Sequence, residues 1–525
     1  MKAKVISLEE AAGWVKDGDT IATSGFGLAG HPEEILVAIE KRFLQSGNPT
    51  NLTVLHAAGQ GNWEGGGIDH LAHQGLLKRL IGGHVGTCPK LVALINQNKI
   101  EAYNFPQGVI CHLYRAIAAK KPGDITKIGL KTYIDPRLEG GRLNRCTAEN
   151  LVQLIQINGE EWLFYPSLPI QIALIRGTTA DEYGNISMEE EAIFSEGLAI
   201  AQAAKASGGK VIVQVKYLAQ GGSLDAQLVK IPGILVDAIV ISKQPEQYHR
   251  QTSGTYYSPV FAGHVKIPLL AWPVMPLDEK KVIARRAFME LTPHAIVNLG
   301  IGLPEFIAAV AAEEGAGDQL TLTIEAGQTG GIPASGLNFG AVANPWAIID
   351  QGAQFDFYDG GNLDMTFLGL AQASSRGDVN VSKFGSKIAG CGGFVNITQN
   401  TKKVIFCGRF TAGKFKAEIG NGKLNILQEG SGKKFVKQVE QVTFSGAQAI
   451  ETGQQVLFIT ERAVFELRKE GLVLTEIAPG ADIQKDVLVQ MEFKPVIAKD
   501  LKLMEPAIFS EGPIGLKQCV SGDSA

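Results

Sequence analysis

The sequence predicts an α/β protein made of two duplicated, open α/β domains with mostly parallel sheets. Many of the 62 glycines directly follow short β-branched runs, and a strand that runs into a glycine-rich turn and then a helix is typical of this class. The chain has 525 residues, whereas single hydrophobic cores stop growing at about 250–300 residues, so two large domains are expected.

The first elements of the chain have clear local signals. Ser7 and Glu10 form a capping box in front of an apolar helix that includes residues 11–15. Residues 20–23 (TIAT) then form a β-branched strand, which ends in Gly25-Phe26-Gly27.

The same order of elements returns in the second half of the chain. Asp278 caps a helix that reaches Phe288, and residues 295–298 (AIVN) form a strand that ends in Gly300-Ile301-Gly302. A Pro-Glu pair follows each turn, at 32–33 and at 304–305, and opens an apolar helix.

The next strands resemble each other more closely still. Residues 52–60 are LTVLHAAGQ and residues 320–328 are LTLTIEAGQ, which indicates an internal duplication. We therefore predict an N-terminal domain at 1–272 and a C-terminal domain at 277–525, joined through the proline-rich residues 273–276. Because ligands of open α/β sheets bind beyond the carboxyl ends of the strands, the active site is expected between the two halves.

Glu325 is the first candidate for chemistry. It stands at the predicted carboxyl end of a strand, where the first half of the chain has Ala57. Glycines follow it at 327, 330 and 331, and they allow a substrate to approach closely. The alternative role is a carboxylate that caps a helix or binds loop amides.

Two further sequence motifs contain groups that could bind a substrate or an oxyanion. The backbone amides of Gly390-Cys391-Gly392-Gly393-Phe394 could bind an oxyanion, although a tight turn would give the same pattern. Gln107, within Pro106-Gln107-Gly108 at the start of a predicted helix, could hold a carboxylate by its amide, or could be an ordinary turn residue.

Together these motifs resemble the family I CoA-transferases. Glu325 in Glu-Ala-Gly, the Gly-Cys-Gly-Gly-Phe motif at 390–394 and Pro-Gln-Gly at 106–108 carry the resemblance, which runs over essentially the whole chain. It is closest to the single-chain acetate and propionate CoA-transferases. Members of the family often have Glu-Asn-Gly or Glu-Ser-Gly at the nucleophile, whereas this chain has Ala326 in the middle position.

The resemblance implies a covalent mechanism. Glu325 would attack an acyl-CoA, and the released thiolate would convert the resulting anhydride to a γ-glutamyl-CoA thioester, which a second acid then cleaves. The amides of Gly392 and Gly393 would stabilise the oxyanions, with Ile301 as a second donor, and Gln107 would orient either the Glu325 carboxylate or the acid substrate. Gly300, Gly302, Gly390, Cys391 and Phe394 are expected to line the substrate site.

The partners expected from the resemblance are an acyl-CoA and a small carboxylic acid, such as acetate or propionate, in a homodimer or homotetramer. CoA is a substrate in this chemistry, so no cofactor or metal is expected. The alternatives are an acyl-CoA hydrolase on the same fold, a non-catalytic metabolite-binding protein, and an NAD-dependent oxidoreductase. The last is suggested by G-x-G-x-x-G at residues 25–30.

Composition and charge narrow the class of protein. The net charge is −4, which gives no reason to expect binding to nucleic acid or to an anionic membrane. Six cysteines without a CxxC pair indicate reduced thiols, and neither an apolar signal region nor a stretch of about 20 apolar residues occurs, so a cytoplasmic protein is expected. His70 and His73 are interpreted as structural, and Glu189–Glu191 as a solvated helix start.

Overall fold

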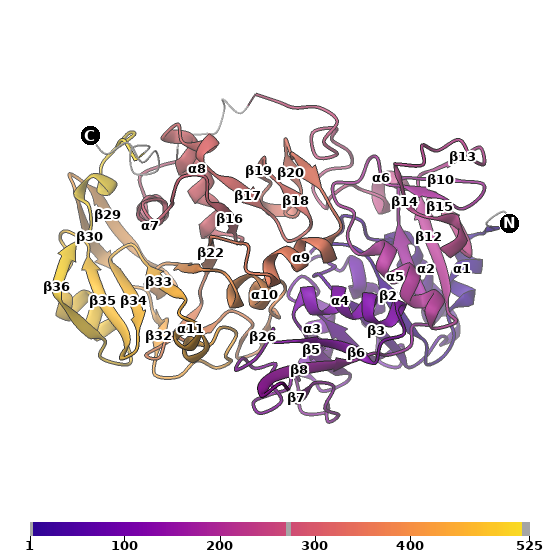
Figure 1. Ribbon diagram of the computed structural model, residues 1–525, viewed down its shortest axis with the longest axis horizontal. Coiled ribbons are helices and arrows are strands. Elements are labelled where there is room, and N and C mark those ends of the chain that lie inside the picture. The colour runs from indigo at the N-terminus through magenta and orange to yellow at the C-terminus, as the bar shows by residue number, and fades with distance from the viewer. Residues whose placement is uncertain (1–3, 269–274, 517–525) are drawn as a thin grey trace. The chain divides into compact units, whose positions relative to one another are not determined.

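The computed structural model describes residues 4–268 and 275–516 and divides into two compact units (Figure 1). The first unit comprises Met1–Ile267, Ile324–Asp356 and Gly385–Asn396, and the second comprises Pro268–Thr323, Phe357–Phe384 and Ile397–Ala525. Two segments of the second half of the chain therefore fold with the first half. The limits 1–272 and 277–525 refer to the duplicated halves and stay a prediction, and Pro273 and Val274 of the expected join lie outside the described residues.

A parallel sheet forms the centre of the first unit. Every neighbouring pair of its strands runs parallel. In spatial order the strands are β1 (Lys4–Val5), β15 (Ala238–Ile241), β12 (Lys210–Val215), β9 (Ile172–Arg176), β2 (Thr20–Thr23), β3 (Leu52–His56), β4 (Leu77–Gly82) and β5 (Glu101–Asn104).

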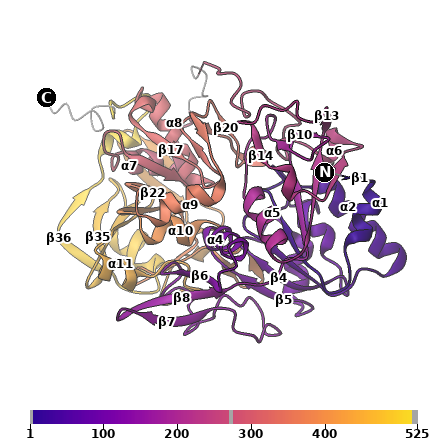
Figure 2. The same cartoon turned by 45° about the vertical axis from the view of Figure 1, so that its right-hand side comes forward.

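Helices cover this sheet because its strands are apolar on both faces, as expected for a buried parallel sheet. Three helices share one hydrophobic core with the strands: α1 (Leu8–Trp14), α2 (Glu33–Ser46) and α3 (Pro89–Asn96). The helices α4 (Gln107–Ala118) and α5 (Gly197–Ala206) pack against each other (Figure 2), and α5 contacts β9 and β12. Ser7 caps α1, since its Oγ accepts a hydrogen bond from the Glu10 N–H at 3.1 Å, as predicted.

Smaller elements complete the first unit. They are an antiparallel sheet of β6 (Gly123–Thr126), β8 (Glu160–Pro166) and β7 (Gln153–Ile157), a sheet of β13 (Tyr217–Ala219), β10 (Thr179–Asp181), β11 (Ile186–Ser187) and β14 (Val229–Ile231), the hairpin strands β18 (Gln328–Thr329), β19 (Ile332–Pro333), β20 (Val342–Ala343) and β21 (Ala347–Ile348), strand β26 (Lys387–Ile388), and helix α6 (Pro245–Tyr248).

The second unit has its own twisted sheet. Five neighbouring strands run parallel, the next two continue the sheet antiparallel, and the last pairs parallel with its neighbour; this extension is drawn orange to yellow in Figure 1. In spatial order the strands are β17 (Thr321–Thr323), β16 (Ile296–Leu299), β22 (Met365–Gly369), β27 (Lys403–Cys407), β33 (Gln455–Ile459), β34 (Ala463–Arg468), β35 (Gly471–Ile477) and β36 (Val496–Leu503).

Helices and short strands surround that sheet. The helices are α7 (Glu279–Phe288), α8 (Phe306–Glu313) and α11 (Gly446–Thr452), while α9 (Gln351–Asp359) and α10 (Phe394–Gln399) each begin in the first unit and end in the second. The short strands are β23 (Gln372–Ser374), β24 (Val379–Asn380), β25 (Lys383–Phe384), β28 (Thr411–Ala412), β29 (Lys416–Gly420), β30 (Lys423–Gln428), β31 (Gly432–Lys433) and β32 (Phe435–Val436). Asp278 caps α7, as predicted, by accepting from the Lys280 and Lys281 N–H groups.

The two sheets share one plan, which confirms the predicted duplicated α/β fold. The order β3-β2-β9-β12-β15 in the first sheet has the same succession along the chain as β17-β16-β22-β27-β33 in the second. In each copy a helix precedes the first strand and another helix connects it to its neighbour: α1 and α2 in one copy, α7 and α8 in the other. Because the strands run parallel, the loops that follow them lie at one edge of each sheet.

The interpretation of Glu189–Glu191 as a solvated helix start is wrong. Glu191 is 3% exposed and forms a hydrogen-bonded ion pair with Arg176, whose side chain is also buried. Glu190 pairs with Lys216 at 2.8 Å, and the next helix, α5, begins only at Gly197. The run Glu189–Glu191 is therefore not a solvated helix start, because Glu190 and Glu191 pair with cations 26 and 15 residues away and Glu189 accepts a hydrogen bond from Thr179.

Candidate active site

The glycine motif of the second half lies against strand ends of the first half, within the first unit. The Gly392 N–H donates to the Gly83 carbonyl at 2.7 Å, and the Gly392 carbonyl accepts from the Gln107 N–H at 2.9 Å. Val85 and Gly86, which follow β4, both donate to the Ala389 carbonyl. Two sequence clusters that are almost 300 residues apart, at 107 and at 390–394, are thereby brought together.

Asn104, the last residue of β5, holds this arrangement in place. It is fully buried, and its amide group donates to the carbonyls of Gly82 and Gly83 at 2.7 and 2.6 Å. Its side-chain oxygen accepts from the Cys391 N–H at 2.8 Å. Sequence reasoning missed this residue, although its place at a strand end, two residues before Pro106-Gln107, was a usable signal.

Gln107 begins α4 and points its amide toward the glycine motif. The residue is 1% exposed, and its Nε2 has no hydrogen-bond partner among the described residues. A methyl group on Gly392 would lie 3.7 Å from its Oε1. An unpaired buried amide is costly unless something binds it, so the side chain is suited to hold a polar ligand beside Gly392.

The residues of the motif differ in what they can do. Gly390 has φ +86, and an added Cβ would lie 2.8 Å from Asn104 Nδ2, so only glycine fits. Burial raises the pKa of the Cys391 thiol to about 12, which keeps it protonated and a poor nucleophile. The Gly392 N–H already donates to Gly83, whereas the Gly393 N–H has no partner among the described residues. Phe394 is buried at the start of α10.

Glu325 lies in a tight turn after β17. The turn is closed by a hydrogen bond from the Gly327 N–H to the Ile324 carbonyl at 3.0 Å, so Glu325 and Ala326 are its two central residues. Gly327 has φ +116, and a Cβ there would lie 2.1 Å from the Ile349 carbonyl oxygen. The glutamate is partly exposed, whereas its neighbours Ile324 and Ala326 are buried.

The neighbours of Glu325 place it among the strand ends of the first unit. Ile324 and Ala326 belong to one hydrophobic cluster with Phe26 and Ala29, which follow β2, and with Ala58, which follows β3. In an open α/β sheet this carboxyl edge is where ligands bind. The predicted nucleophile thus lies at the expected edge of the first sheet.

The remaining predicted residues belong to the second unit. Gly300, Ile301 and Gly302 follow β16, and the Gly300 and Gly302 N–H groups donate to the Phe367 carbonyl and the Glu305 carboxylate. The Ile301 side chain is 56% exposed, and its N–H has no partner among the described residues. Of this turn, only the Ile301 amide is free to act as a donor.

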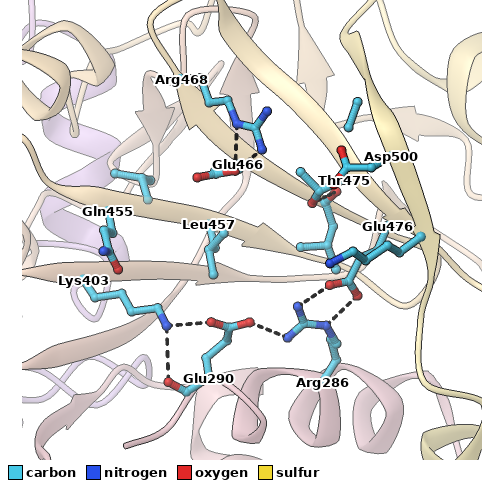
Figure 3. A pocket seen from close by; sticks show the side chains of 14 residues that line it. Arg286, Glu290, Lys403, Gln455, Leu457, Glu466, Arg468, Thr475, Glu476 and Asp500 are labelled. Atoms are coloured by element: carbon cyan, nitrogen blue, oxygen red, sulfur yellow. Dashed lines mark hydrogen bonds and ion pairs between the residues drawn. The ribbon is translucent and has the colours of Figure 1, made fainter.

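A charged hollow in the second unit is a poor candidate (Figure 3). It lies at the amino ends of β27 and β33, where Lys403 and Gln455 begin these strands, and therefore at the edge opposite to the usual ligand edge. Glu290 bridges Lys403 and Arg286, and Arg286 binds Glu476. Its lining has four cationic and four anionic side chains, so it offers no net charge to a charged ligand.

The histidines at 70 and 73 have structural partners. His70 bridges Glu33 and Glu40, and His73 binds Glu40 at 2.7 Å. These contacts join α2 to the segment that follows β3. No group of three metal-binding side chains occurs among residues 4–268 and 275–516, and no helix within these residues combines the length and the apolar character needed to cross a membrane.

Comparison with known proteins assigns the family. The model for the coenzyme A transferase family matches residues 5–242. Caffeate CoA-transferase of Acetobacterium woodii is 51% identical over 98% of this chain and 99% of its own length. The chain belongs to the family I CoA-transferases. Acetate CoA-transferase YdiF of Escherichia coli O157:H7 is 42% identical over 98% of this chain and 96% of its own.

Solved structures agree with this assignment. The apoenzyme of the E. coli acyl-CoA transferase YdiF matches this CoA-transferase with a TM-score of 0.93 at 41% identity, covering 98% of this chain and 97% of that one. A YdiF structure described as a thioester complex with CoA matches with a TM-score of 0.92. The sequence resemblance is confirmed, and the oxidoreductase interpretation of residues 25–30 is replaced by CoA transfer.

Proposed function

We propose that this CoA-transferase moves CoA from a short-chain acyl-CoA to a small carboxylic acid through a covalent thioester on Glu325. The observation that carries the proposal is the turn that presents this glutamate at the carboxyl edge of the first sheet, with its flanks packed against Phe26 and Ala58. A glutamate is ionised at neutral pH and needs no base to act as a nucleophile.

The reaction has four balanced steps. A carboxylate oxygen of Glu325 attacks the acyl carbonyl, and CoA leaves as a thiolate, giving a mixed anhydride. The thiolate attacks the Glu325 side-chain carbonyl, and the first acid leaves as a carboxylate. A second carboxylate attacks this glutamyl-CoA thioester and expels the thiolate, which then attacks the new acyl group and frees Glu325. Because the thioester energy is conserved, we propose that no cofactor or metal takes part.

Each tetrahedral intermediate carries an oxyanion that requires hydrogen-bond donors. We assign this role to the Gly393 amide, whose N–H has no partner among the described residues; Ile301, whose N–H is likewise unpaired there, stays the second donor that the sequence predicts. One such donor contributes about 10²–10³ in rate. Gln107 is assigned to the carboxylate of the acid substrate, because its buried Nε2 has no partner among the described residues and its Oε1 lies 3.7 Å from the position that a Cβ of Gly392 would occupy. Gly300, Gly302, Gly390, Cys391 and Phe394 would line the substrate site without contributing donors of their own.

The relatives support this chemistry and widen the choice of acid. One relative is named an acetate and another a caffeate CoA-transferase, and YdiF forms a thioester complex with CoA. We propose acetate, propionate and similar short acids as the first candidates, with phenylacrylic acids tested beside them. A homodimer or homotetramer in the cytoplasm completes the proposal, and native mass spectrometry tests the assembly.

Mass spectrometry of the intact protein tests the intermediate. Incubation with acetyl-CoA and no acceptor should add the mass of CoA with loss of water, and peptide mapping should place the adduct on Glu325. Two-substrate kinetics should give parallel double-reciprocal lines. An adduct on a cysteine, or ternary-complex kinetics without any adduct, would overturn the proposed mechanism. Rapid release of thiol in the absence of an acceptor would assign hydrolysis instead.

A further inference from the structure

His84 follows Gly82-Gly83 at the carboxyl end of β4 and is enclosed by glycines. A methyl group on Gly59 would lie 2.7 Å from its Nδ1, and one on Gly86 would lie 3.1 Å from its Cε1. A methyl group on Gly392 would lie 3.9 Å from its Cβ. The ring therefore lies between the segment after β3 and the glycine motif of the second half.

This position adjoins both parts of the proposed active site, which are the turn of Glu325 and the glycine motif around Gly392. Ala58, directly before Gly59, shares a hydrophobic cluster with Ile324 and Ala326 on either side of Glu325. On the other side, the site that a Cβ of Gly392 would occupy lies 3.7 Å from Gln107 Oε1 and 3.9 Å from His84 Cβ. The His84 and Gln107 side chains thus flank the same point above Gly392.

The His84 imidazole has no hydrogen-bond partner among the described residues, unlike the other imidazoles that are buried or half-buried there. Within the described parts of the chain, each other imidazole that is buried or half-buried contacts a polar group; the contacts are His31 with Ser24, His56 with Ala58, His70 and His73 with Glu40, His112 with Gly352, and His249 with Gln214. For His84 there is no such contact, although the residue is only partly exposed. Neither ring nitrogen is among the buried polar atoms that lack a partner, so the ring is open to solvent and to a ligand.

Burial also keeps the ring uncharged. It lowers the pKa of His84 to about 4, so the imidazole is neutral at physiological pH and has one N–H donor. A neutral donor can hold a carboxylate without adding a positive charge that would reduce the nucleophilicity of the nearby glutamate. The orphaned Gln107 amide is likewise neutral.

We infer that His84 and Gln107 together bind the carboxylate of the acid substrate above Gly392, each donating one hydrogen bond. This inference rests on the proposed function, because the acid must lie beside Glu325 both when it leaves and when it attacks. His84 forms and breaks no covalent bond in this role. It orients the carboxylate so that one oxygen faces the glutamyl carbonyl, and such orientation accelerates a positioned reaction.

Three variants separate hydrogen bonding from packing. His84→Leu keeps approximate bulk without a donor, His84→Asn keeps a donor, and His84→Ala leaves space for added imidazole. A hydrogen bond to a charged group contributes about 1.5–3 kcal/mol, so kcat/KM for acetate should fall about 10- to 150-fold in His84→Leu. His84→Asn should recover part of the loss, and imidazole should raise the activity of His84→Ala.

The control is His73→Leu, the same change at a half-buried imidazole that binds Glu40 away from the glycine motif. It should keep kcat/KM for acetate within about twofold of the wild type, as expected for a change that touches no substrate. Thermal unfolding of all variants shows whether any loss of activity follows loss of structure. For folded variants, an unchanged kcat/KM for acetate in His84→Leu would overturn the inference. The inference would also be overturned if His84→Leu and His84→Asn lost kcat/KM equally and added imidazole did not raise the activity of His84→Ala.

The covalent adduct distinguishes this inference from the function on which it rests. If wild-type protein forms the Glu325 adduct and His84→Leu uses acetate normally, only the role of His84 fails. If wild-type protein forms no adduct on Glu325 at all, the proposed function fails first. We expect instead that the wild type and His84→Leu both form the Glu325 adduct, and that the thioester of His84→Leu reacts with acetate more slowly than that of the wild type.

Discussion

The Asn104 side chain joins the two halves of the chain at the glycine motif, because its oxygen accepts the Cys391 N–H at 2.8 Å while its amide binds two carbonyls at the end of β4. The contact spans 287 residues of sequence. Tyr133 also donates to the same oxygen. No part of this amide is left for another partner, so its role is to fix the loop.

Asn104→Ala should therefore destabilise the protein and also disturb catalysis. It removes one of the donors to each of the Gly82 and Gly83 carbonyls and leaves the Cys391 N–H unpaired, and an unpaired buried group alone costs about 1–3 kcal/mol. We expect the free energy of unfolding to fall by at least about 2 kcal/mol and kcat to fall as well. Denaturant unfolding and steady-state kinetics measure the two effects.

Asn144→Ala is a matched control for that change. Asn144 also bridges two carbonyls, those of Ile95 and Ile100, both at 2.9 Å, but it makes no contact with the glycine motif. It should lose stability while keeping kcat under conditions where it is folded. Equal loss of kcat in both folded variants would show that Asn104 has no special link to the site.

Glu325→Asp should separate transfer from hydrolysis. Removal of one methylene withdraws the carboxylate by about 1.5 Å, and a misplacement near 1 Å costs about 10²-fold in a positioned reaction. The aspartate could still act as a general base for water in the vacated space, so acyl-CoA hydrolysis should appear as CoA transfer falls. Glu325→Ala should lack both activities. Wild-type transfer by Glu325→Ala would exclude this residue as the nucleophile.

Gly392→Ala tests the space above the glycine motif. The added methyl has room, since its nearest neighbour is Gln107 Oε1 at 3.7 Å, but it fills the point where we place the carboxylate. The positive φ costs about 1–2 kcal/mol. Gly385→Ala has nearly the same φ, +54 against +52, and open surroundings, so it shares the strain but not the obstruction. Transfer activity should fall about 10²-fold only in Gly392→Ala. Equal activity in the two variants would show that no ligand group lies above Gly392.

The ion pairs of His70 should make stability depend on pH. Burial alone would lower the pKa of His70, but the hydrogen bonds and charges of Glu33 and Glu40 outweigh it and raise the pKa above 6.5. A raised pKa gives stability that is fully present below 6.5 and is lost as pH rises through the folded-state value. Unfolding free energies of the wild type should therefore decline above pH 6.5, and His70→Gln should flatten that decline. Parallel pH profiles would contradict the assignment.

Local sequence signals predicted where the helices and strands occur better than they predicted which segments pack together. The helix starts at Ser7 and Asp278 and the duplicated strands were readable because capping and periodicity depend on neighbouring residues. The family was recognised from three short motifs. The limits of the compact units were not readable, because residues 324–356 and 385–396 return to the first unit through contacts that no local pattern encodes.

The details of the site depend on contacts between distant residues. Asn104 and His84 were missed, since an Asn or His after a strand gains meaning only when Gly392 and Cys391 are placed beside it. Glu191 was interpreted as exposed, because the sequence around it does not show that Arg176 lies opposite. The expectation that a strand holds Glu325 was also incomplete: the glutamate lies in the turn that follows, and the Gly327 conformation closes that turn.

The bonds that hold Gly392 to Gly83 and Gln107 are made entirely by main-chain atoms. Such bonds do not depend on which side chain a position carries, provided the backbone can adopt the required conformation. Neighbouring side chains can therefore change through mutation while the loop keeps its place. A protein of this design can acquire a preference for a different acid by substitutions around the loop, without having to rebuild the framework on which its chemistry depends.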